Sequence, residues 1–216
     1  MNNKLIIGID IDNTITNLYE LEVERGREFC KEFNLSTDNF NPHCINVKEM
    51  YNIPDDLYSV YMNRYFRYNV NRVPPRKMAV SVINTLCTYY SVHIVTARDK
   101  DYKGEYSGSM MVQDTYNYFN HYGFRNNIFH FSSFNKADVC KQYGINVLIE
   151  DDPKHIKECV DSGIIVIVMS TPYNQDMRDL MNTVFIESWD EVPAVISSIE
   201  YFLKCQSYIS DVVTLR

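Results

Sequence analysis

The sequence predicts an α/β protein built on a doubly wound parallel sheet, with a small helical cap inserted after the first strand. Several short runs rich in Ile and Val are nearly continuous rather than alternating, which is typical of parallel strands covered on both faces. Segments with helical spacing lie between these runs, and this alternation predicts right-handed crossovers. We therefore expect a Rossmann-like sheet with helices on both faces.

The expected first strand is Leu5–Ile9, and the next clear strand begins only at Val92. A strand–helix–strand unit needs roughly 30 residues, so the excess length between the two strands predicts an insertion. We assign residues 17–73 to a small helical cap, and residues 1–16 and 74–216 to the core. Because the chain has no long linker, the cap is expected to pack on the core.

The insertion contains a charged helical stretch (Leu18–Phe33), a polar irregular stretch (Asn34–Cys44) and an aromatic helical stretch (Asp55–Tyr68). Tyrosines in the last stretch recur at three- and four-residue steps, which places them on one face of a helix. They are Tyr58, Tyr61, Tyr65 and Tyr68. Two interpretations remain open: the tyrosines pack the cap against itself or the core, which we favour, or they stack on the base of a substrate.

The elements after the insertion continue the alternation. The Pro74-Pro75 pair marks the start of a helix over Lys77–Tyr89, and the strand Val92–Val95 follows. Val112–Tyr122 has an aromatic helical face, and Ile128–Phe131 is a weaker strand candidate. Helix, strand, helix and strand in this order extend the doubly wound pattern.

The C-terminal part of the chain repeats the pattern. Val147–Ile149 is a short buried strand, and Asp152 suits the N-cap of a helix over Pro153–Val160, which has proline at its first position. The remaining expected elements are the strands Ile164–Met169 and Phe185–Ile186 and a closing helix over Asp190–Leu203.

Composition excludes several classes of protein. The 216 residues are 45% hydrophobic, enough for one sizeable core, and the net charge of −7 is a poor match for a nucleic-acid polymer, which needs a basic footprint. The six cysteines form no C-x-x-C pair, so we expect reduced thiols rather than a zinc site or disulfides. No apolar run is long enough for a membrane span or a secretory signal. We expect a cytoplasmic protein, with a homodimer left open.

The strongest chemical signal is the segment Asp10-Ile11-Asp12-Asn13-Thr14, directly after the first strand. In an open α/β sheet, ligands bind beyond the carboxyl ends of the strands. A carboxylate in that position can attack phosphorus, and a second acid can protonate the leaving oxygen and later activate water. Taken alone, Asp10 and Asp12 are explained equally well as polar residues in a turn that follows a strand.

Two further features follow in order along the chain. Thr96, after the second strand, places its hydroxyl and the adjacent backbone N–H groups where they could hold phosphate oxygens. Lys136, before a helical stretch, could neutralise the charge of a nucleophile and a phosphate held close together. Each residue alone has an ordinary explanation: Thr96 is simply a threonine after a strand, and Lys136 is a lysine exposed to solvent.

Three consecutive acids, Glu150, Asp151 and Asp152, follow the strand that ends at Ile149. Three acids after a buried strand repel one another unless they share a cation, and their hard oxygen ligands suit Mg²⁺. A helix cap explains Asp152 and exposure to solvent explains Glu150, but neither explains Asp151 well.

The order of these features resembles the four motifs of the haloacid dehalogenase (HAD) superfamily of aspartyl phosphohydrolases, in the residues Asp10, Thr96, Lys136 and Asp151. The resemblance covers about residues 4–16 and 74–200 and implies a HAD-like core. An insertion between the first two motifs resembles the small cap of that superfamily, which covers the site and helps to select the substrate.

The resemblance implies a role for each residue. Asp10 would be the nucleophile and Asp12 the general acid and base, with Thr14 supporting their loop. Thr96 would bind the phosphate, and Lys136 would steady both the phosphate and Asp10. The expected substrate-binding set is Thr14, Thr96, Ala97, Arg98 and Lys136.

The resemblance also implies Mg²⁺ as the cofactor. The ion would be held by Asp10, by the backbone carbonyl of Asp12 and by Asp151, with Glu150 and Asp152 as candidates for the surrounding shell. Asp12 separates the chain from the dehalogenases, which lack this second acid.

A finer resemblance is to bacterial nucleotidases grouped with the 5'(3')-deoxyribonucleotidases. It rests on the segments Ile11-Asp12-Asn13-Thr14, Thr96-Ala97-Arg98, Ile149-Glu150-Asp151-Asp152-Pro153 and Ser188-Trp189-Asp190-Glu191. Two positions depart from the deoxyribonucleotidases, which usually have Gly-Val in place of Asn13-Thr14 and often Asp-Asp-Arg in place of Asp151-Asp152-Pro153.

These resemblances imply a Mg²⁺-dependent phosphatase that hydrolyses a small phosphate monoester through an aspartyl-phosphate intermediate. The expected substrate is a small phosphorylated metabolite, first of all a nucleoside 5'-monophosphate. Two alternatives stay open: a phosphatase of sugar phosphates or other small metabolites, and a non-catalytic module that binds a phosphate ligand.

The sequence lacks the motifs of several other enzyme classes. No cysteine has arginine six positions further on, which excludes the cysteine phosphatases. The chain contains no P-loop, no dinucleotide fingerprint and no nucleophile elbow of a serine hydrolase. The insertion's two lysines, Lys31 and Lys48, stand in no context diagnostic of a phosphonatase.

Overall fold

The computed structural model describes residues 5–125 and 128–214, so the outermost residues of the predicted core, 1–4 and 215–216, lie outside it. The described strands form one sheet in the order β3-β2-β1-β4-β5-β6, and every pairing is parallel. This order is that of a doubly wound sheet, which confirms the predicted Rossmann-like fold. The strands are β1 (Ile6–Ile9), β2 (Ser91–Val95), β3 (Phe129–His130), β4 (Val147–Glu150), β5 (Ile165–Met169) and β6 (Thr183–Ile186).

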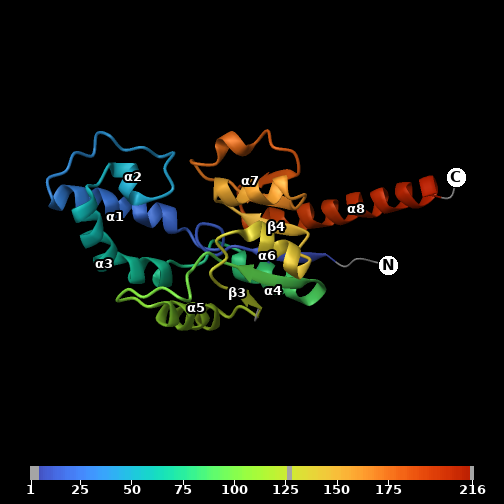
Figure 1. The fold of residues 1–216 in the computed structure, drawn as a ribbon, viewed down its shortest axis with the longest axis horizontal. Coiled ribbons are helices and arrows are strands. Elements are labelled where there is room, and N and C mark those ends of the chain that lie inside the picture. Colours follow the sequence, from blue (N-terminus) through green and yellow to red (C-terminus); the bar gives the residue numbers. More distant parts are fainter. Residues whose placement is uncertain (1–4, 126–127, 215–216) are drawn as a thin grey trace.

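Helices cover both faces of the sheet (Figure 1). One face packs against α4 (Ala79–Tyr89), α5 (Gly108–Tyr122) and α8 (Val192–Thr214), and the other against α6 (Lys136–Tyr143) and α7 (Pro153–Asp161). Successive strand residues point to opposite faces, so Ile7 and Ile9 pack under α4 and α8, whereas Val166 and Val168 pack under α6 and α7. Burial on both faces explains why the strands are continuously apolar.

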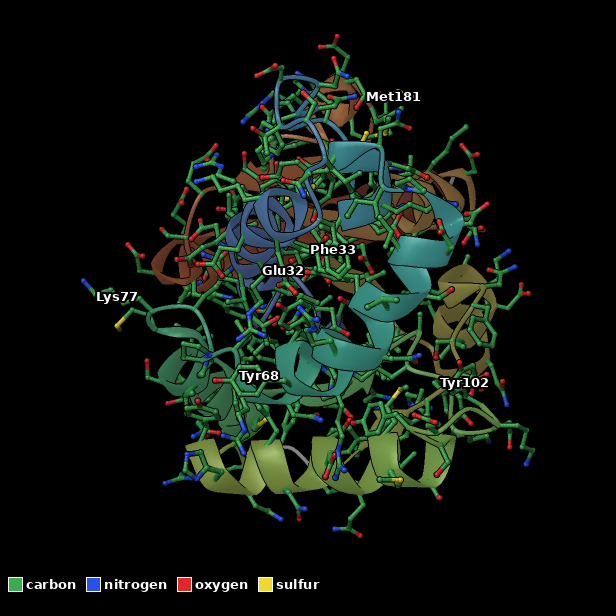
Figure 2. The ribbon with its side chains drawn as sticks, turned by 90° about the vertical axis from the view of Figure 1, so that its left-hand side faces the viewer. Glu32, Phe33, Tyr68, Lys77, Tyr102 and Met181 are labelled. Atoms are coloured by element: carbon green, nitrogen blue, oxygen red, sulfur yellow. The ribbon has the colours of Figure 1, made fainter. Side chains whose placement is uncertain are left out.

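Three helices lie between β1 and α4: α1 (Leu18–Glu32), α2 (Val47–Tyr51) and α3 (Asp55–Arg72). Figure 1 shows them grouped beyond the carboxyl ends of the strands, on the side opposite both chain termini. Figure 2 looks onto α1 and α3 and shows α5 crossing below α3. The chain enters and leaves this group through Thr16 and Pro75, which form an isolated bridge. The division of the chain into a core and a cap stays a prediction.

The aromatic residues of α3 pack mainly within this group of helices. Tyr61 is almost fully buried, and its ring lies 5.4 Å from that of Phe29 in α1 and 5.0 Å from that of Tyr65. Tyr58 and Tyr61 are stacked at 6.5 Å, whereas Tyr68 is 45% exposed. The packing interpretation therefore holds for the central tyrosines.

Several element boundaries differ from the expected ones for local reasons. Helix α4 begins at Ala79 rather than Lys77 because Met78 has a left-handed backbone with φ 68°. Helix α5 begins four residues early, at Gly108, where a Cβ atom would lie 2.1 Å from the carbonyl oxygen of Lys100. The short helix α2 is missed from the sequence, although Asn46 caps it by accepting from the Glu49 amide at 2.9 Å. In the part of the chain that the structure describes, no helix is both long and apolar enough to cross a membrane.

Candidate active site

The sheet order brings the predicted site residues to one edge. β1 lies between β2 and β4, with Ile9 paired to both Ile94 and Ile149. The residues that follow these strands therefore emerge side by side, and the amide of Asp10 donates to the Ile149 carbonyl at 3.0 Å. The crevice beyond the carboxyl ends, where the strand order reverses between β1 and β4, is the usual ligand site of such a sheet.

Lys136 lies at the centre of the site. It is the first residue of α6, and its ammonium group lies 2.5 Å from Asp10 Oδ1 and 2.7 Å from Glu150 Oε2. Burial alone would lower the pKa of Lys136, but the charges of Asp10 and Glu150 outweigh burial and raise it above its ordinary value. The lysine therefore keeps its charge although only 2% of it is exposed.

Lys136 contacts two of three buried carboxylates that lie close together. Asp10, Glu150 and Asp151 each place one oxygen within 4.8 Å of the others. Burial raises the pKa of Asp10 to about 7, with Lys136 opposing the shift and Glu150 adding to it. Burial, followed by the charges of Glu150 and Asp10, also raises the pKa of Asp151 well above its ordinary value. A cluster of hard oxygen atoms with excess negative charge fits a divalent cation such as Mg²⁺.

Two hydroxyl groups hold the Asp151 carboxylate. Thr14 donates to Oδ1 at 2.6 Å and Tyr173 donates to Oδ2 at 2.5 Å. Asn174 donates to the Asp151 carbonyl at 2.9 Å and fixes the backbone. Tyr173 and Asn174 were missed from the sequence. The available signal was that both belong to a polar segment directly after the strand Ile164–Met169, at the same edge of the sheet.

The neighbouring acids have different partners. Glu150 Oε1 accepts from the backbone amides of Asp151 and Asp152 at 3.0 Å each, so both of its oxygens have partners inside the protein. The Asp152 side chain accepts from the Lys154 amide at 2.8 Å and caps α7, as the helix-cap interpretation expects. A place for either residue around a metal stays a prediction.

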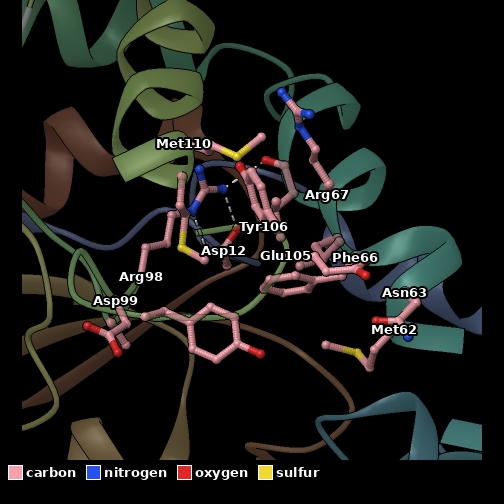
Figure 3. A pocket seen from close by; sticks show the side chains of 15 residues that line it. Asp12, Met62, Asn63, Phe66, Arg67, Arg98, Asp99, Glu105, Tyr106 and Met110 are labelled. Atoms are coloured by element: carbon pink, nitrogen blue, oxygen red, sulfur yellow. Dashed lines mark hydrogen bonds and ion pairs between the residues drawn. The ribbon is translucent and has the colours of Figure 1, made fainter. Parts of the chain in front are cut away.

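Asp12 lies beside this cluster and faces a cleft. Arg98 donates to its two carboxylate oxygens, from Nε to Oδ2 at 3.0 Å and from Nη2 to Oδ1 at 2.7 Å (Figure 3). The Asp12 side chain is 29% exposed, whereas that of Arg98 is only 4% exposed. In this structure the Arg98 guanidinium binds Asp12, so its predicted contact with a phosphate stays a prediction.

Thr96 is buried one strand away, and its hydroxyl accepts from the Arg98 amide at 3.2 Å. Ala97 follows it and lines the cleft in front of Asp12. The structure therefore brings Thr96 and Ala97 to the same edge as Asp10 and Lys136, where the sequence places a phosphate.

The loop that carries Asp10 and Asp12 is braced from three directions. Asn13 has φ 65°, a conformation that asparagine tolerates better than most residues, and its side chain accepts from the Tyr19 amide at 2.5 Å. The buried Trp189 indole donates to the Thr14 carbonyl at 3.0 Å. Arg76 donates to the Asn13 carbonyl at 3.1 Å. The left-handed backbone and the bond to Tyr19 explain the asparagine, and the bond of the Thr14 hydroxyl to Asp151 explains the threonine.

The cleft in front of Asp12 has a volume of about 670 Å³ and lies between α3 and the segment that leads into α5. Its walls combine thioether, aromatic and aliphatic side chains with charged and polar ones (Figure 3). The lining residues include Met62, Asn63, Phe66, Tyr102, Glu105 and Tyr106. A mostly apolar cleft with a few polar groups is typical of a site for an organic ligand.

No protein-family model matches the chain. A protein named nucleotidase from Clostridium acetobutylicum is 25% identical over 196 residues, which cover 89% of this chain and 94% of that protein. A HAD-like hydrolase from Streptococcus pneumoniae has a TM-score of 0.60 and 16% identity, covering 91% of this chain and all of that one. The HAD-hydrolase YfnB from Bacillus subtilis, solved with magnesium bound, has a TM-score of 0.56 and 14% identity, covering 90% and 99% of the two chains. The fold implied by the sequence resemblance is confirmed.

Proposed function

The chain has the haloacid dehalogenase-like fold, and from this premise we propose that it is a Mg²⁺-dependent phosphohydrolase of small phosphate monoesters, with a nucleoside 5'-monophosphate as the substrate. The observation that carries the proposal is the buried group of Asp10, Lys136 and Asp151 beside the cleft-facing carboxylate of Asp12. A nucleophile, a fixed cation and a second acid stand together where phosphoryl transfer needs them.

In the proposed reaction, the Asp10 carboxylate attacks phosphorus while the bond from phosphorus to the leaving oxygen breaks. Asp12 gives its proton to that oxygen, and the alcohol departs into the cleft. A water molecule then attacks phosphorus and gives a proton to Asp12. The Asp10–phosphorus bond breaks, which restores the carboxylate and releases inorganic phosphate.

The protein contributes charge and position to both steps. Lys136, held between Asp10 and Glu150, opposes the negative charge of the phosphate without needing to reorient. A Mg²⁺ ion held by Asp10, the Asp12 carbonyl and Asp151 would supply further positive charge at the phosphate oxygens. Thr14 and Tyr173 fix the direction of the Asp151 carboxylate before any ion binds.

Two observations support a nucleotide as the substrate. The cleft beside Asp12 is lined by the aromatic side chains of Phe66 and Tyr106, which pack edge to face on each other, and by polar groups such as Asn63 and Glu105. These groups suit an aromatic base with hydrogen-bonding edges. The protein from C. acetobutylicum that matches most of the chain is also named a nucleotidase.

A substrate panel tests this proposal. Purified protein with Mg²⁺ is assayed for phosphate release from nucleoside 5'-monophosphates, 3'-monophosphates and sugar phosphates. We expect turnover that EDTA abolishes and that favours the nucleoside 5'-monophosphates. Asp10→Asn should lose turnover entirely and keep the circular dichroism spectrum of the parent protein, because the amide has nearly the same shape as the carboxylate.

The outcomes separate the alternatives. Equal or better turnover of sugar phosphates would overturn the nucleotide assignment but keep the phosphatase. Binding of phosphate without turnover of any substrate would indicate the non-catalytic module. Turnover in Asp10→Asn, or in EDTA, would contradict the proposed chemistry itself.

A further inference from the structure

Arg98 connects three separate parts of the molecule through one buried guanidinium group. It lies three residues beyond β2, and besides its two bonds to Asp12 it donates from Nη1 to Thr115 Oγ1 at 3.0 Å and from Nη2 to the Val70 carbonyl at 2.9 Å. Thr115 belongs to α5, and Val70 belongs to α3. One side chain thus contacts the Asp12 loop, a helix on the face of the sheet and a helix of the insertion.

The contact with Asp12 fixes the orientation of the carboxylate. A planar guanidinium that donates two bonds to one carboxylate restrains both its position and its rotation. Arg98 approaches from the buried side, while Asp12 keeps 29% of its side chain exposed toward the cleft. The acid is therefore held from behind and remains open in front, where the leaving oxygen of a substrate would lie.

The contact with Val70 depends on the end of α3. The last four carbonyl groups of a helix have no partner within the helix, and α3 ends at Arg72, so the Val70 carbonyl is one of them. The partial negative charge at a helix C-terminus also favours a cation there. Val70 packs with Tyr106 and Met111 in an apolar cluster between α3 and α5, which sets the distance from its carbonyl to Arg98.

From this geometry we infer that Arg98 is a positioning residue that couples the docking of α3 to the orientation of Asp12. When α3 packs on α5, the Val70 carbonyl completes the set of acceptors and the guanidinium holds Asp12 in the cleft-facing direction. When α3 moves away, the guanidinium loses an acceptor and its hold on Asp12 weakens. This inference rests on the proposed role of Asp12, and it ties the orientation of that carboxylate to the contact between Arg98 and the end of α3.

Arg98→Lys tests the coupling because it keeps the charge but cannot donate two parallel bonds. We expect kcat to fall on the order of 10²-fold, the cost of misplacing a reacting group by about 1 Å, with KM changed less than about threefold. Hydrogen exchange should become faster in the last turn of α3, around Val70, as the carbonyl loses its partner. Thr115→Val, which leaves Arg98 in place and removes one acceptor, should give a smaller loss of kcat.

Asp114→Asn is the matched control. Asp114 joins α5 to α3 by accepting from Arg67 Nε at 3.1 Å and from Asn71 Nδ2 at 3.2 Å, and it has no hydrogen bond or ion pair with Asp12 or Arg98 among the described residues. It should keep kcat within about twofold. If Asp114→Asn loses as much kcat as Arg98→Lys, general loosening of the α3–α5 contact explains the effect and the inference is wrong.

The remaining outcomes distinguish this inference from the proposed function. An active parent protein with an unchanged kcat in Arg98→Lys would overturn the inference alone. A parent protein that hydrolyses no phosphate ester would overturn the proposed function. In that case, hydrogen exchange in Arg98→Lys still tests the link between Arg98 and α3. Unchanged exchange around Val70 would overturn this link too.

Discussion

Lys136 shows how one residue determines the charge of the site. Its ammonium group is the only cation that touches Asp10 and Glu150 among the described residues, and Asp151 lies beside both acids. The three buried carboxylates have this one ammonium group in direct contact, so their combined negative charge exceeds that of the cation that touches them. Such a group is costly without a further cation, so the arrangement fits the metal site that we propose.

The hydroxyl of Tyr173 offers a test of that site at the scale of one residue. Tyr173→Phe removes the hydrogen bond to Asp151 Oδ2 and leaves the ring in place. Losing a group that orients a metal ligand typically weakens the metal about 10- to 100-fold. We expect a loss in that range for Mg²⁺ or Mn²⁺ binding, measured by isothermal titration calorimetry without any substrate.

Tyr19→Phe provides the matched control for that experiment. Tyr19 belongs to the same aromatic cluster, with its ring 5.4 Å from Tyr173, and its hydroxyl donates to the Pro42 carbonyl at 2.8 Å rather than to Asp151. Its loss should leave metal affinity unchanged. Equal losses in the two variants would mean that the cluster, and not the bond to Asp151, governs binding.

At the scale of elements, the strands could be predicted because strands buried on both faces consist of continuous apolar residues. Exposed loops are more polar, so the two are distinguishable in the sequence. β5 is the clearest case, with Val166, Ile167, Val168 and Met169 all fully buried. Helix starts were harder to predict. The left-handed Met78 and the close approach of Gly108 to Lys100 depend on neighbours that only the folded chain provides.

A histidine pair at the β2–β3 edge gives a prediction about pH. His93 Nδ1 and His130 Nε2 lie 2.9 Å apart, and burial lowers the pKa of both side chains, with the charge of His93 lowering that of His130 further. An unfolded histidine has a pKa of about 6.5. As pH falls below that value, the unfolded chain binds protons before the folded one, so these groups make the folded state less stable.

The measurement is the free energy of unfolding by urea at about pH 7.5 and about pH 5.5, on either side of the ordinary histidine pKa. We expect the parent protein to lose stability at the lower pH. The double variant His93→Gln, His130→Gln should lose less, and the difference between the two proteins isolates the pair from other titrating groups. Identical pH dependence in both proteins would show that the pair does not contribute.

At the scale of the whole molecule, the sequence predicted the residues that the sheet alone positions. Asp10, Thr96 and Asp151 follow strands, and Lys136 begins a helix, so their order along the chain was sufficient to expect them at one edge. Contacts between the insertion and the rest of the chain could not be predicted from the order of the strands and helices. The bond from Arg98 to Val70 and the place of Tyr173 in the cluster around α1 and α3 depend on how distant segments pack.

The same packing makes the stability of the folded chain a test of the proposed metal site. Asp10, Glu150 and Asp151 are buried together in the folded state and separate when the chain unfolds. An ion that binds only the folded state therefore stabilises it, by about 2.7 kcal/mol at a concentration 100 times its Kd. For a chain of this size, each kcal/mol raises Tm by roughly 2–4 °C. We expect Mg²⁺ to raise Tm and EDTA to reverse the effect.

Asp151→Asn separates metal binding from simple screening of charge. The variant removes one acid from the cluster, so the metal-free protein should melt no lower than the parent, while most of the shift caused by Mg²⁺ should disappear. Potassium chloride at the same ionic strength controls for screening, which is weaker for buried than for exposed charges. A full Mg²⁺ shift in Asp151→Asn, or an equal shift with potassium chloride in the parent, would place the ion elsewhere and remove Asp151 from the proposed site.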